Sequence, residues 1–187
     1  MNPNIYTVIP ARGGSKSVPR KNIKPLNGHP LIKYSIDYSN ASSLVNRTIV
    51  STDDEEIADI AKGLGADVPF MRPQSLGGDL VQDYPVVMHA LIALEEIYEE
   101  TIDIIILLRP TSPLRPSNLI ESGISLLKND PAATSVRAVA SSTEHPYRQW
   151  GMQDGYIIGF SNDLTSKIEP FNLPRQELPE VFFQTGD

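Results

Sequence analysis

The chain has 187 residues, 40% of them hydrophobic, which suits one α/β domain with a sizeable core. It contains no cysteine, which excludes disulfide scaffolds, thiolate metal sites and cysteine nucleophiles. Without a signal peptide or an apolar run of membrane-spanning length, we expect a cytoplasmic protein with no membrane contact. The net charge of −7 argues against nucleic-acid binding, because that binding depends on broad neutralisation of phosphates.

The first predicted element is a buried strand over residues 5–9, an apolar and largely β-branched run. A loop over residues 11–24 follows, and it carries no acid but five cations, Arg12, Lys16, Arg20, Lys21 and Lys24. Glycine, serine and proline separate these cations, which favours a ligand-binding loop over a solvated basic surface. A flexible cationic loop at the end of a strand is typical of phosphate binding.

Four helices and four further strands are predicted after this loop. We expect the helices at residues 30–41, 53–63, 84–99 and 117–129, and the strands at residues 47–52, 67–71, 103–108 and 133–139. Residues 103–108 form the most apolar run and are predicted to be the central strand. The acidic run at residues 53–56 is interpreted as a helix start rather than as a metal site. The alternation predicts a mostly parallel sheet with helices on both faces.

Two more polar loops are predicted, at residues 72–83 and 109–116. Each follows a predicted strand, as the cationic loop does. Ligands of parallel sheets bind outside the carboxyl ends of the strands. We therefore expect the three loops to converge on one rim of the sheet.

Residues 141–180 have a different character, and we interpret them as an arm of a single domain that spans residues 1–187. The dipeptide Asp154-Gly155 is a strong hairpin turn signal between two apolar runs. An isolated hairpin is only marginally stable in water, so the arm is expected to pack on its own core or on a second subunit. Residues 182–187 begin another apolar strand, and we expect that a C-terminal part is missing.

Residues 9–22 read Ile-Pro-Ala-Arg-Gly-Gly-Ser-Lys-Ser-Val-Pro-Arg-Lys-Asn and resemble the signature of the acylneuraminate cytidylyltransferases, the CMP-sialic acid synthetases. Weaker matches follow in the expected order at residues 50–53, 72–79, 108–115 and 174–179. The resemblance implies a Rossmann-like three-layer α/β nucleotidyltransferase fold with a protruding β-hairpin arm that forms a homodimer. It also implies that a nonulosonic acid attacks the α-phosphate of CTP, with Mg²⁺ assisting, to give a CMP-sugar and pyrophosphate.

The resemblance also implies roles for individual residues. The catalytic clamp on the triphosphate would be Arg12, Lys16 and Lys21. The nucleotide would contact Ala11, Arg12, Gly13, Ser15, Asn22, Arg72, Asp79 and Asp83. The sugar acid would face Arg109 and Ser112, and would meet Arg148 and Arg175 from the arm of the partner. For these two arm residues, surface solvation is the alternative. The metal ligands are expected beyond residue 187.

The sequence departs from the usual pattern of that family at Phe183, at residues 185–187 and at two positions expected near the substrates. Arg109 stands where most sialic-acid members have glutamine, and Asp83 stands where a small residue often meets the base. A carboxylate at residue 83 suits the amino group of cytosine, but it equally suits the donors of guanine. Alternatives therefore stay open: a sister enzyme for legionaminic, pseudaminic or Kdo-type acids, a GTP-using enzyme, or a non-catalytic nucleotide-binding module.

Overall fold

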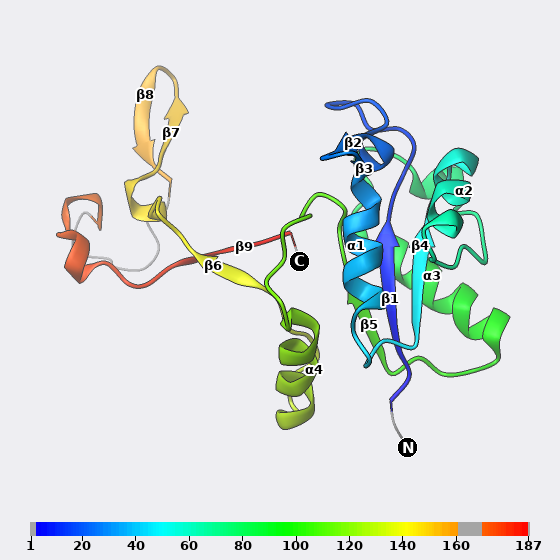
Figure 1. Cartoon of the computed structure of the whole chain (residues 1–187). Helices are drawn as coiled ribbons and strands as arrows, with labels where there is room; N and C mark the ends of the chain where they lie inside the picture. The colour runs from blue at the N-terminus through cyan, green and yellow to red at the C-terminus, as the bar shows by residue number, and fades with distance from the viewer. Residues whose placement is uncertain (1–2, 161–169, 187) are drawn as a thin grey trace. The chain divides into compact units, whose positions relative to one another are not determined.

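The computed structural model describes residues 3–160 and 170–186. The chain forms two compact units, one of residues 1–137 with 186–187 and one of residues 138–185 (Figure 1). The second unit contains the residues that were predicted to form the arm. No helix in the described ranges combines the length and apolar character of a membrane span.

A parallel sheet forms the centre of the first unit. Its strands are β1 (Ile5–Pro10), β4 (Arg47–Ser51) and β5 (Ile104–Leu107), in the spatial order β4-β1-β5. Val8 pairs with Ile49 on one side and with Leu107 on the other, so β1 lies in the middle (Figure 1). The prediction that residues 103–108 form the central strand is wrong for the sheet described, because an apolar run shows which faces are covered and not the lateral order of strands.

Helices cover both faces of this sheet, as the sequence predicts. Helices α1 (Leu31–Asn40), α2 (Glu55–Gly63) and α4 (Leu119–Asn129) pack on the face that carries Ile5 and Ile9. Helix α3 (Asp83–Tyr98) packs on the face that carries Tyr6 and Val8. Alternate residues of β1 thus enter two separate cores, which gives a three-layer α/β/α arrangement.

Two predicted strands differ from the structure. The run at residues 67–71 is reduced to one bridge between Ile49 and Asp67, because Pro69 has no N–H to extend a ladder. The strand expected at residues 133–139 does not join the parallel sheet. Instead β6 (Val139–Ser141) pairs antiparallel with β9 (Phe182–Gln184) in the second unit. The expected apolar strand at the end of the chain is therefore present.

Two tight hairpins are present where turn signals predict them. Strands β2 (Pro25–Leu26) and β3 (His29–Pro30) flank Asn27-Gly28, and strands β7 (Trp150–Gln153) and β8 (Tyr156–Gly159) flank Asp154-Gly155. All four turn residues have positive φ, as a type I′ turn requires. The 3₁₀ helices are η1 (Lys21–Ile23), η2 (Gln74–Leu76), η3 (Pro146–Arg148), η4 (Pro170–Asn172) and η5 (Arg175–Glu177).

Candidate functional site

A cavity of about 220 Å³ lies beyond the carboxyl ends of β1 and β5. Residues from all three predicted loops line it, which confirms that the loops converge on one rim. Eight predicted site residues are among the lining residues: Arg12, Ser15, Lys21, Asn22, Arg72, Asp79, Asp83 and Arg109. This is the location at which open parallel sheets bind ligands.

The start of the cationic loop is fixed by backbone contacts. The buried Ala11 donates its N–H to the carbonyl of Ser51 at 2.9 Å, which continues the pairing of β1 with β4. The buried amide of Asn22 donates to the carbonyl of Arg12, also at 2.9 Å, and so closes the loop on itself. Asn22 therefore shapes the loop as well as lining the cavity.

Two of the predicted clamp residues share one carboxylate. Asp79 receives Arg12 Nη2 on Oδ1 at 2.7 Å and Lys16 Nζ on Oδ2 at 2.5 Å. The hydrogen bond from Lys16, followed by the charges of Lys16 and Arg12, lowers the pKa of Asp79 below its usual value. Asp79 thus joins residues 72–83 to the cationic loop through the same two cations that were predicted to hold phosphate.

The far end of the cationic loop is bound to the start of α2. Arg20 forms ion pairs with Asp54 and Glu56, and its hydrogen bond to Asp54 is the main cause of the lowered pKa of that carboxyl. Asp54 also accepts the N–H of Ile57 at 3.0 Å and so caps the helix. The interpretation of the acidic run as a helix start is confirmed for Asp54.

Asp53 has a different role, which the sequence interpretation missed. It does not cap α2 but accepts the N–H of Gly13 at 2.9 Å, from the cationic loop. The signal that could have revealed it is its position two residues after β4, at the rim where the loops meet.

Arg72 is a cation buried in the wall of the cavity. Its side chain is 3% exposed, and burial is the main cause of the lowered pKa of its guanidinium. Its nearest carboxylate is Asp53, with 3.8 Å between Nη2 and Oδ1. Within the described residues, neither Nε nor Nη2 has a hydrogen-bond partner. Arg72 therefore has donors to offer to an anionic or carbonyl-bearing ligand.

Two of the residues that depart from the expected family pattern, Arg109 and Asp83, contact each other. Arg109 binds Asp83 Oδ2 through Nε at 3.1 Å and also through Nη2. The carbonyl of Arg109 accepts from Arg115 Nη2 at 2.6 Å, which fixes the backbone of this loop as well. The cavity thus has a neutral ion pair where a base and a sugar acid were predicted to bind separately.

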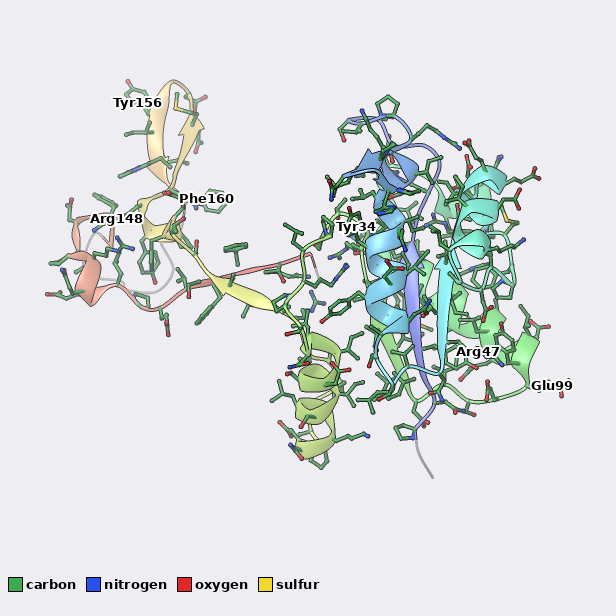
Figure 2. The ribbon with its side chains drawn as sticks, in the orientation of Figure 1. Tyr34, Arg47, Glu99, Arg148, Tyr156 and Phe160 are labelled. Carbon is green, nitrogen blue, oxygen red and sulfur yellow. The ribbon has the colours of Figure 1, made fainter. Side chains whose placement is uncertain are left out.

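The remaining predicted residues lie away from the cavity lining. Ser112 donates its N–H to the carbonyl of Arg109 at 3.2 Å and supports the loop. Arg148, labelled in Figure 2, donates to the carbonyl of Leu173 at 3.0 Å within the second unit, and Arg175 begins η5 there. Their role in the site of a partner subunit stays a prediction.

The carboxylates of the cavity do not fit a resident metal ion. No group of three or more histidine, aspartate or glutamate side chains in the described part of the chain could hold one. Asp79 and Asp83 in the cavity lining, and Asp53 beside Arg72, each have an arginine or lysine nearby instead. These carboxylates pair with neighbouring cations.

Comparison with known proteins identifies one family and several relatives of this chain. A family model described as cytidylyltransferase matches residues 6–149. The pseudaminic acid cytidylyltransferase of Campylobacter jejuni is 39% identical over 114 residues, which cover 61% of this chain and 49% of the relative. The CMP-N,N'-diacetyllegionaminic acid synthase of Legionella pneumophila is 39% identical over 127 residues, which cover 66% and 53%. This chain spans about half the length of these relatives.

A solved structure shares the fold. CMP:2-keto-3-deoxy-manno-octonic acid synthetase, solved with CTP, superimposes with a TM-score of 0.67 at 20% identity over 98% of this chain and 72% of that one. At this identity the likeness concerns the fold alone. It confirms the expected Rossmann-like nucleotidyltransferase architecture.

Proposed function

The chain belongs to the cytidylyltransferase family, and from this membership we propose that it activates a nonulosonic acid with CTP, forming a CMP-sugar and releasing pyrophosphate. The observation that carries the proposal is the cavity at the strand ends, where Arg12, Lys21 and Arg72 gather. A cationic site of this kind suits a triphosphate. The lining carries four arginine and lysine side chains against two carboxylates, so it keeps a net positive charge.

The chemistry follows from this distribution of charge. The anomeric hydroxyl of the acid attacks the α-phosphorus and loses its proton to solvent. The bond from that phosphorus to the oxygen that bridges the α- and β-phosphates breaks, and pyrophosphate leaves with the negative charge. Nucleotidyl transfer needs alignment and charge stabilisation more than a nucleophilic side chain. We assign the charge stabilisation to Arg12, Lys16 and Lys21. Magnesium is proposed only as an ion that accompanies the triphosphate, and no step is assigned to it.

The choice of sugar acid is proposed at the level of the class. The two relatives are named for pseudaminic and diacetyllegionaminic acids, whereas the motif at residues 9–22 resembles that of the acylneuraminate enzymes. The Arg109–Asp83 pair gives this cavity a neutral polar wall, which suits a hydroxyl-rich sugar acid better than a second polyanion. All three acids belong in the assay.

The reaction is tested by pyrophosphate release from the protein with Mg²⁺, each nucleoside triphosphate and a panel of nonulosonic acids. We expect release with CTP and one of these acids, and a CMP-sugar of the corresponding mass. Release with GTP alone would contradict the cytidylyl assignment. Nucleotide binding without release for any pair would identify a non-catalytic binding module instead.

We also propose that the second unit mediates a homodimer. The support is a set of apolar side chains exposed on one face of its hairpin region. Tyr156 is 76% and Phe160 71% exposed (Figure 2), and Ile158, which the strand alternation places on the same face, is 45% exposed. Exposed apolar clusters of this kind mark interaction surfaces. We expect a dimeric mass by light scattering and a monomeric mass for Tyr156→Ser/Phe160→Ser. Glu177→Gln, an exposed change in the same unit, should stay dimeric. A monomeric wild type would refute the proposal.

A further inference from the structure

Asp53 lies where the cationic loop and the loop before α3 come together. Its Oδ1 accepts the N–H of Gly13 at 2.9 Å. Its Oδ2 approaches the backbone of Gly77 so closely that a Cβ at that glycine would clash with the carboxylate. The side chain is 17% exposed, so one short carboxylate contacts both loops in a largely enclosed position.

Both backbone contacts of Asp53 bear on Arg12. Gly13 is the next residue along the chain, so the hydrogen bond to its N–H fixes the peptide that follows Arg12. Gly77 offers its carbonyl to Arg12 Nη1 at 3.4 Å, while Nη2 meets Asp79 at 2.7 Å. Asp53 therefore contacts the chain directly after Arg12 and the residue that receives its guanidinium.

We propose that Asp53 is a positioning residue, which holds Arg12 in the cavity by fixing the backbones of Gly13 and Gly77. This role differs from helix capping, because Asp54 caps α2. The positioning role of Asp53 rests on one part of the proposed function, namely that Arg12 binds a polyphosphate. A cation displaced by about 1 Å can cost roughly 100-fold in rate, so a residue that fixes its backbone has a measurable effect.

A double-mutant cycle on polyphosphate affinity tests this role. The dissociation constant of inorganic tripolyphosphate is measured by calorimetry for the wild type, Asp53→Ala, Arg12→Ala and the double variant. We expect Asp53→Ala to weaken binding about tenfold, which is less than the roughly 100-fold rate cost of a 1 Å displacement. The double variant should bind no more weakly than Arg12→Ala alone, because Asp53 acts through Arg12.

Two further variants separate hydrogen bonding from charge. Asp53→Asn keeps an oxygen for the Gly13 N–H and should restore affinity to within about threefold of the wild type, since the contact is retained while only the charge is lost. Asp59→Asn, the same change at an exposed position on α2, should have no effect. Melting temperatures of all variants are recorded, because a merely structural role predicts a lowered melting temperature and no dependence of the affinity loss on Arg12.

Three results would overturn the proposal. The losses of affinity in the cycle could be additive, Asp53→Asn could bind tripolyphosphate as weakly as Asp53→Ala, or the wild type could bind no tripolyphosphate. If Asp53→Ala does not fold, hydrogen exchange of the wild type still decides, because an unprotected Gly13 amide would contradict the contact. Binding of tripolyphosphate needs neither base nor sugar. A protein that binds it but releases no pyrophosphate from any substrate pair would refute the proposed function alone.

Discussion

Replacing Lys21 with alanine is expected to lower kcat/KM for pyrophosphate release by about 10²- to 10³-fold, the cost of removing one preorganised charge-stabilising donor. Lys21 begins η1 and lines the cavity. Unlike Arg12 and Lys16, it has no carboxylate partner within residues 3–160 and 170–186. Its charge is therefore available to a ligand without displacing an internal anion.

The same substitution should leave stability almost unchanged, because a half-exposed lysine without an ion pair contributes little to folding. The measurements are steady-state pyrophosphate release and thermal unfolding. Lys24→Ala is the matched control, since Lys24 belongs to the same loop but is exposed and lies outside the cavity lining. A melting temperature lowered by many degrees with little loss of turnover would contradict the clamp role.

Replacing Arg72 with methionine is expected to weaken nucleotide binding while leaving the protein as stable as before, or more stable. The guanidinium is 3% exposed, and in the described chain its Nε and Nη2 donate to no acceptor. A buried donor without a partner costs about 1–3 kcal/mol, and methionine fills a similar volume without that cost. We expect the melting temperature to rise by up to several degrees.

The affinity for CTP should fall, whereas the stability should rise. A hydrogen bond to a charged group contributes about 1.5–3 kcal/mol, so the dissociation constant for CTP should rise by about 10- to 100-fold. Calorimetry measures this dissociation constant, and unfolding in urea measures the stability of the protein. Arg137→Met, on an exposed arginine of the same unit, serves as the control for loss of one positive charge. A destabilised Arg72→Met that still binds CTP at the original affinity would show that Arg72 has only a structural role.

The sequence predicted the cationic loop well, because the residues that indicate the loop are neighbours along the chain. The order of cations, glycines and serines after an apolar strand indicates both a loop and a polyanion. It did not reveal Asp53, because an aspartate next to a helix start has the same local pattern whether it caps the helix or reaches across to Gly13. Only the tertiary arrangement distinguishes Asp53 from Asp54.

Local sequence patterns also could not predict which charged side chains of the cavity form ion pairs. Asp83 and Arg109 were predicted to serve different parts of the substrates, yet they form an ion pair across 26 positions of sequence. The burial of Arg72 depends on the packing of segments around it, which composition does not report. The strand error at residues 67–71 has a different origin, because Pro69 is visible in the sequence and prevents a full ladder there.

The outer position of β5 has a consequence for solution behaviour. In the described part of the chain, β5 is hydrogen-bonded on one side only, to β1, although Ile104–Leu107 is wholly apolar. An apolar strand with an open row of N–H and C=O groups is a template for a further strand. We expect the open edge of β5 to favour pairing with a further strand, from this chain or from another molecule.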